Sequence, residues 1–153
     1  MVNKFVLISI IPLLVLSVLG GVGYNEYLKL QQITAEIKSI EITDASLTGA
    51  SVNFDLSLYN PAYVSLPIEE LTMDIFAQGL KIGTVESESF TLESQKTVDR
   101  TFSLRVSFLD LGLSAIELFK QKDVQWIVEG KAIVTLPLGY KYTHNFKLPK
   151  EQQ

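Results

Sequence analysis

The sequence predicts an all-β domain, an antiparallel β-sandwich with one helical insert, preceded by an N-terminal transmembrane helix. Three observations support this prediction. Residues 5–23 form an uninterrupted apolar run, most of the remaining chain alternates polar and apolar residues, and one later segment has helical spacing. A period of two is typical of strands with one buried face, and several short strands separated by turn residues are typical of a sandwich.

The first 25 residues predict a membrane anchor. Phe5 to Gly23 contains no charge, and its nineteen residues would span about 28 Å as a helix, close to the hydrocarbon thickness of a bilayer. Tyr24 and Tyr27 fit an interfacial aromatic belt. A cleaved signal peptide is the alternative, but the run is long for a signal sequence and no A-x-A-like cleavage site follows it.

The predicted orientation rests on the charges that flank the apolar run. Only the α-amino group and Lys4 precede it, and the positive-inside tendency then places the N-terminus in the cytoplasm and the domain outside. Cleavage of a signal peptide would instead yield a secreted domain. We expect an anchor over 1–25, a linker over 26–32 and the sandwich over 33–150.

Strands are expected where apolar residues recur at every second position. A turn at Gln78-Gly79 separates two of them, and the short strand Lys81–Glu86 follows it. A change of phase near Ser39 predicts a bulge. The expected inward-facing rows are Ile33–Ile37, Ile40–Ile42, Val52–Leu58, Leu71–Ala77, Val98–Phe108, Val124–Val134 and Tyr140–Leu148.

The segment between residues 108 and 122 has helical spacing instead. Capping-box patterns occur at Ser107 with Asp110 and at Ser114 with Glu117, and the sequence does not choose between these two starts. Gly112 weakens the longer helix by about 1 kcal/mol of helix propensity. The expected apolar stripe consists of Leu109, Leu113 and Ile116.

The stretch LYNPAYVSLPI, residues 58–68, contains two proline motifs. The residue before a proline is pushed toward extended geometry, so Asn60-Pro61 is expected to end a strand and begin a turn. Pro67, followed by Ile68, is expected at the start of the next strand. Because turn chemistry accounts for these residues, we interpret them as structural and not as ligand contacts.

Asn60-Pro61 followed by Leu66-Pro67-Ile68 resembles the signature of the late-embryogenesis-abundant group 2 family, also called the water-stress-and-hypersensitive-response (WHy) domain. The order of the expected strands and helix agrees with this family from Ile33 to Phe146. Ala62 departs from the family pattern, which often has a second Asn there. The resemblance implies a fibronectin-III-like sandwich, an association with desiccation and other stresses, and membrane-anchored relatives. It implies neither enzymatic activity nor a cofactor.

The composition excludes several classes of function. The chain has 153 residues, a formal net charge of −4, one histidine and no cysteine. The lack of cysteine excludes disulfides, thiolate metal sites and thiol nucleophiles, and the acidic balance disfavours nucleic-acid binding. We expect no cofactor, no metal and no catalytic residue, and the sequence identifies no small-molecule substrate.

Several residues of types that carry chemistry in other proteins have simpler interpretations here. His144 lies in the expected inward row of its strand and is interpreted as a hydrogen-bonded or rim residue and not as a ligand, because no second histidine or cysteine accompanies it. Trp126 is expected in the core. Glu69-Glu70, with Glu86 and Glu88, is interpreted as a solvated acidic face and not as a calcium site, because no Asp-rich loop with a glycine is present.

Two functional hypotheses follow. The first is a non-enzymatic, membrane-anchored module that protects against desiccation or osmotic stress and displays an acidic sandwich outside the cytoplasm. Its expected partners are the membrane, through the N-terminal helix, and other envelope proteins. The second is a constitutive scaffold or accessory subunit of a cell-envelope complex.

Overall fold

The computed structural model describes residues 25, 28–29, 32–121 and 123–149. The predicted anchor from Phe5 to Gly23 lies outside these residues. Within the part of the chain that is described, no helix is both long enough and apolar enough to cross a membrane.

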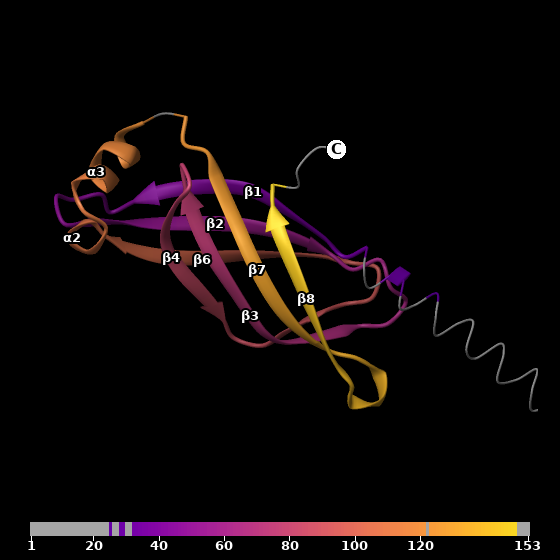
Figure 1. The fold of residues 1–153 in the computed structure, drawn as a ribbon. Helices are drawn as coiled ribbons and strands as arrows, with labels where there is room; N and C mark the ends of the chain where they lie inside the picture. The colour runs from indigo at the N-terminus through magenta and orange to yellow at the C-terminus, as the bar shows by residue number, and fades with distance from the viewer. Residues whose placement is uncertain (1–24, 26–27, 30–31, 122, 150–153) are drawn as a thin grey trace, which may run out of the picture.

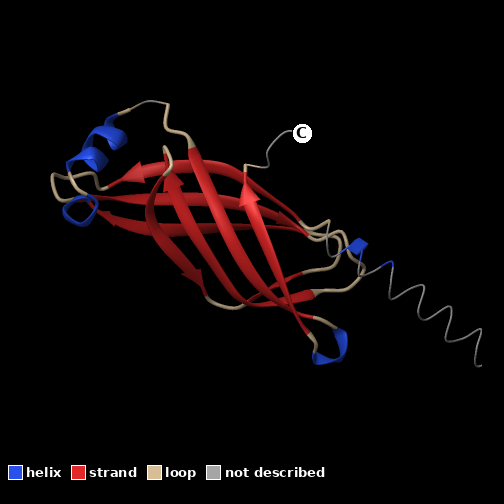
Figure 2. Cartoon of the chain, in the orientation of Figure 1, coloured by secondary structure: helices blue, strands red, loops and turns tan. Residues whose placement is uncertain are grey.

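Two antiparallel sheets face each other and form a β-sandwich (Figures 1 and 2). The three-stranded sheet has the order β1 (Thr34–Thr43), β2 (Gly49–Tyr59), β6 (Thr97–Ser107). The five-stranded sheet has the order β4 (Leu80–Ser87), β3 (Leu66–Ala77), β7 (Trp126–Thr135), β8 (Lys141–Leu148), and β5 (Phe90–Leu92) pairs with the start of β3.

The alternation in the sequence places the core as expected. Along β2, Val52, Phe54, Leu56 and Leu58 are all buried, whereas Asn53 and Asp55 between them are only partly covered. The row on β3 from Leu71 to Ala77 is also buried. The bulge expected near Ser39 is confirmed, since the register between β1 and β2 shifts between Ile37 and Ser39.

The helical insert differs from the prediction. Gly112 has φ 84°, and at this residue the segment divides into α2 (Phe108–Leu111) and α3 (Leu113–Lys120). A single helix would require a negative φ at this position, so the four-residue spacing that would align Leu109 with Leu113 on one helix face is lost. Phe108, Ala115 and Leu118 are buried instead.

Two details of the expected helix are therefore wrong. Leu109 is 80% exposed and does not belong to a buried stripe. Neither capping box forms, because Ser107 makes no side-chain hydrogen bond as the N-cap of α2 and Gly112 is the N-cap of α3. Phe108, expected as the last inward residue of a strand, begins α2 and packs on Phe119 with ring centroids 5.3 Å apart.

The strands run between two ends of the sandwich (Figure 1). One end, called here the entry end, carries the start of β1 and the loops β2–β3 (60–65), β5–β6 (93–96) and β7–β8 (136–140). The other, the far end, carries the β1–β2 turn, the β3–β4 turn, α2 and α3. Pairing of Thr34 with Tyr59, and of Ile68 with Val134, fixes this arrangement.

One long side of the sandwich is closed by close packing of β4 on β6. A Cβ on Gly83 of β4 would lie 2.7 Å from Cδ1 of Leu104 of β6, so any larger residue at position 83 would displace this leucine side chain. Arg100 occupies an inward position of β6 but is exposed, and its guanidinium lies 4.6 Å from the ring centroid of Phe90. The arginine thus covers the edge of the core through a cation–π contact.

Candidate functional site: a cavity between the sheets

An apolar cavity of about 290 Å³ lies between the sheets on the opposite long side, where β1 and β8 approach each other. It is lined by Ile33, Ala35, Leu58, Ile68, Leu71, Phe90, Leu92, Ala132, Val134, His144, Asn145, Phe146, Lys147 and Leu148.

The cavity exists because small residues occupy inward positions that are large elsewhere. Ala35 of β1 lies opposite Leu58, and Ala132 of β7 lies between Leu71 and His144. A larger aliphatic side chain at either alanine would extend into the space. The backbone pairing of both strands is regular at these positions, so both alanine side chains keep their inward direction.

Aromatic side chains of β8 form the rim. Tyr142, His144 and Phe146 are half-buried, with successive ring centroids 6.2 and 6.5 Å apart. The Phe146 ring lies directly over Gly130, where a Cβ would come within 2.0 Å of Cζ. Gly130 therefore allows this ring to lie flat on β7 beside the cavity.

The polar lining residues are confined to β8. They are His144, Asn145 and Lys147, whereas the other eleven lining residues are apolar. The Lys147 ammonium lies 3.2 Å from the Glu129 carboxylate and remains about half exposed. An apolar interior with polar groups on one side of its mouth is typical of a site for an apolar or amphiphilic ligand.

Among the residues that the structure covers, no group of three His, Cys, Asp or Glu side chains could hold a metal ion. The acidic pairs considered in the sequence, such as Glu69-Glu70, are on the surface, where Glu69 pairs with Lys141 at 2.6 Å.

The proline motif lies at the entry end, next to the cavity. Asn60 is fully buried, and its amide Nδ2 donates to the carbonyl oxygens of Val64 at 2.9 Å, Leu92 at 3.1 Å and Glu93 at 3.3 Å. Its Oδ1 accepts from the Ala62 amide at 3.0 Å. One side chain therefore joins the β2–β3 loop to the β5–β6 loop.

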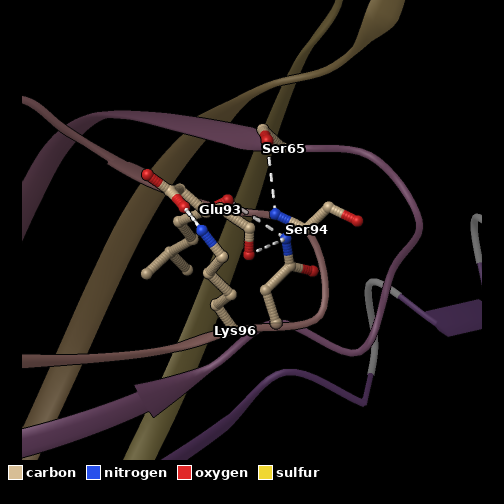
Figure 3. Close-up of polar contacts among 6 residues, drawn as sticks. Ser65, Glu93, Ser94 and Lys96 are labelled. Carbon is tan, nitrogen blue, oxygen red and sulfur yellow. Dashed lines mark hydrogen bonds and ion pairs between the residues drawn. The ribbon is translucent and has the colours of Figure 1, made fainter.

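Neighbouring polar contacts complete this connection (Figure 3). Ser65 Oγ accepts from the Ser94 amide at 3.2 Å, and Glu93 pairs with Lys96 across the β5–β6 loop. The backbone N–H of Asn60 also donates to this loop, to the carbonyl oxygen of Lys96 at 3.1 Å.

The other residues of the motif have separate positions. Pro61 follows Asn60 in the loop and is partly covered, and Pro67 is exposed as the second residue of β3. Ile68 is buried and lines the cavity. The structure therefore brings Asn60 and Ile68 close to the candidate site, while neither proline lines it.

Two other predicted residues have simple surroundings. Trp126 begins β7 and is half-buried, with its ring 5.8 Å from Phe54 and 6.2 Å from Phe119. His144 lies at the rim of the cavity, in contact with two aromatic neighbours.

The outer faces of both sheets carry carboxylates that accept hydrogen bonds from serine, threonine and lysine side chains. Hydrogen bonds from Ser39 and Thr101 keep the pKa of Asp55 below its usual value. Lys141 and Thr135 lower the pKa of Glu69 in the same way. The pKa of Asp74, beside Lys81 and Thr84, is also lowered.

A family model described as late embryogenesis abundant protein matches residues 55–148. The chain belongs to this family. The match covers the site, since it includes Asn60 and all lining residues except Ile33 and Ala35. No curated protein sequence matches the chain significantly.

A solved structure with a TM-score above 0.5 supports the fold of this late embryogenesis abundant protein. The solution structure of AT1g01470 from Arabidopsis thaliana has a TM-score of 0.59 at 17% identity, covering 74% of this chain and 76% of that one. The solution structure of a putative late embryogenesis abundant protein, At2g46140.1, has a TM-score of 0.48 at 15% identity, covering 94% and 88%.

Ala62 is the position at which the sequence departs from the expected pattern of the motif. In this late embryogenesis abundant protein Ala62 is fully buried, its amide donates to Asn60, and its carbonyl accepts from the Gln95 amide at 3.2 Å and from Ser94 Oγ at 3.1 Å. The backbone of residue 62 supplies the turn contacts, so an alanine side chain suffices.

The cavity was missed by sequence reasoning. Ala35, Gly130 and Ala132 were visible as small residues within rows of large apolar ones. That signal could have indicated a gap, but alternation alone does not show whether facing residues of the other sheet fill the space.

Proposed function

We propose that this chain is a non-enzymatic, membrane-anchored protein of the WHy type, which protects against desiccation or osmotic stress. The apolar run from Phe5 to Gly23 anchors it, and the acidic sandwich is displayed outside the cytoplasm. Its body is of the fibronectin III type, an assignment supported by a three-stranded sheet that faces a five-stranded one, in which β5 is only three residues long. The inter-sheet cavity is its binding site and takes a single alkyl chain.

Family membership supports the stress-related part of this proposal. Late embryogenesis abundant proteins are associated with water stress and are generally non-enzymatic. The anchor is supported by the length and lack of charge of residues 5–23.

The cavity is the observation that carries the binding proposal. Apolar cavities of about 150 Å³ stay free of water and bind small apolar molecules. The cavity here is about 290 Å³, is lined by eleven apolar residues and has its polar lining residues on one strand. An alkyl chain fits the interior, and a polar headgroup at the β8 side can contact His144, whereas the side chains of Asn145 and Lys147 lie on the outer face of β8.

Binding can be tested with cis-parinaric acid, a fluorescent fatty acid whose emission increases in an apolar site. The full chain should bind it saturably, and Ala132→Phe, which fills the cavity from β7, should abolish binding. Thr143→Phe is the matched control, because Thr143 is exposed on the opposite face of the neighbouring strand. Equal binding by the wild type and Ala132→Phe would contradict the assignment of the site.

The stress role is tested in cells. A deletion strain should survive drying or osmotic shock less well than its parent, and the wild-type gene should restore survival. Unchanged survival would contradict the protective role. A stoichiometric partner recovered by crosslinking from unstressed cells would favour a scaffold instead.

A further inference from the structure

We propose that the entry end of the sandwich rests on the bilayer, with Leu138 and Tyr140 inserted into the membrane interface and Tyr63 beside them. This inference rests on the proposed anchor, and it adds a second contact between the chain and the membrane. The partner is the surface of the same bilayer that holds residues 5–23.

The β7–β8 loop presents an apolar side chain that the domain itself does not use. Leu138 is 94% exposed and has φ 71°, a left-handed conformation that is unfavourable for leucine. The loop is nevertheless fixed, because the Leu136 amide donates to the Tyr140 carbonyl at 2.7 Å and the Gly139 amide donates to the Leu136 carbonyl at 3.0 Å. A fixed loop therefore holds a leucine out from the protein surface.

Tyrosines extend this surface across the entry end. Tyr140 follows the same loop and is 69% exposed, and Tyr63 of the β2–β3 loop is 66% exposed. Tyr59, at the end of β2, is also among the exposed large side chains. Tyrosine combines an apolar ring with a polar hydroxyl and is enriched where membrane meets water, and leucine inserts into the apolar side of that boundary.

The predicted span ends close to this surface. The Lys29 ammonium lies 3.7 Å from the ring centroid of Tyr63, and Lys29 follows Gly23 by six residues. Six residues reach at most about 20 Å even when fully extended. The entry end is therefore held within that distance of the end of the span, whereas β2, with its eleven residues, places the far end about 36 Å further away.

Charge at the entry end favours a zwitterionic surface. Two ion pairs lie in its loops or at their borders, Lys96 with Glu93 and Lys141 with Glu69. Each pair is neutral and Lys29, over Tyr63, adds a single further charge, so the described loops of this end form no strongly basic patch that would attract anionic lipid. Insertion of Leu138 and Tyr140 is then driven by their apolar surface and is insensitive to salt.

The absence of cysteine allows a direct test. The full chain with Leu138→Cys carries one thiol, which is labelled with the fluorophore NBD and reconstituted into phosphatidylcholine vesicles. Leu47→Cys is the matched control, because Leu47 is also a leucine, is 88% exposed and lies at the far end. Lipids with a spin label near the glycerol quench a fluorophore in the interface, and Tyr140→Cys provides a second position.

We expect the emission at positions 138 and 140 to fall at least twofold in the presence of spin-labelled lipid, and the emission at position 47 to be unchanged. Trp126 fluorescence shows that each labelled variant is folded. Flotation on a density gradient reports anchoring separately. If the chain floats with the vesicles but the labels at 138 and 140 are quenched no more than that at 47, the surface contact is wrong and the anchor stands. If the chain does not float, both proposals are wrong.

Discussion

Asn60 is a fully buried amide that joins two loops at the entry end, and its replacement tests how the motif works. The NH₂ group has two hydrogens for three carbonyl oxygens, and Oδ1 accepts one bond from Ala62. Three hydrogen bonds of about 1 kcal/mol each are lost in Asn60→Ala, and the buried carbonyls left without a donor add to this. We expect the free energy of unfolding to fall by about 3–5 kcal/mol.

Asn60→Asp keeps the shape of the side chain but changes its hydrogen bonding. An oxygen replaces the donor nitrogen and faces the carbonyl oxygens of Val64, Leu92 and Glu93. Burial without a donor raises the pKa of such a carboxyl in the folded state, and protonation restores one O–H donor. The contribution of the protonated carboxyl to the free energy of unfolding is then fully present below the unfolded-state pKa of about 3.9. It is lost, by up to about 1.4 kcal/mol per pH unit, as the pH rises toward the raised pKa of the folded state.

Both effects can be measured by urea unfolding of the full chain in non-ionic detergent. The single tryptophan, Trp126, packs on Phe54 and Phe119 and reports loss of the core. Asn53→Ala is the matched control, because Asn53 lies on the outer face of β2 and accepts one hydrogen bond from Ser103. A loss in Asn60→Ala no larger than in this control would refute the reasoning, as would a pH-independent Asn60→Asp.

Three further results are expected. Phe54→Ala removes a core ring and should cost about 3–5 kcal/mol of unfolding free energy by urea titration, and an unaltered midpoint would place the ring outside the core. Leu14→Asp, in the predicted anchor, should release the chain from membranes in a carbonate wash, since a central Asp costs about 2.5–3.5 kcal/mol. The lowered pKa of Asp55 contributes stability that is present above the ordinary value of 3.8 and is lost as pH falls through the folded value. Asp55→Asn should therefore weaken the acid dependence of the melting temperature, and identical acid profiles would contradict this.

The strands illustrate what local pattern can predict. The rows of β2 and β3 were identified correctly because one face of each strand is buried, and a one-residue shift would expose every apolar side chain. β8 follows the same pattern but is only half-buried apart from Leu148, since it lies at the edge of its sheet. Alternation therefore identified which face of β8 points inward but did not predict how deeply that face is buried.

The helical insert and β6 show where local pattern fails. Leu109 has helical spacing but is exposed, because the positive φ of Gly112 divides the segment. Arg100 is polar but occupies an inward position, because its guanidinium can lie over Phe90 at the sheet edge. Both outcomes depend on neighbours that are distant in the sequence or on a single backbone angle.

The sequence by itself determined the two sheets' inward faces, the proline turn and an apolar leading segment, because each depends on residues adjacent along the chain. Only the tertiary structure decided that β4 closes on β6 while a cavity remains beside β8. It also placed the Asn60 amide among carbonyls of residues 92 and 93 and gathered Tyr63 and Leu138 at one end. These features arise from the spacing and twist of two facing sheets, and the side chains that meet there come from segments far apart in the sequence.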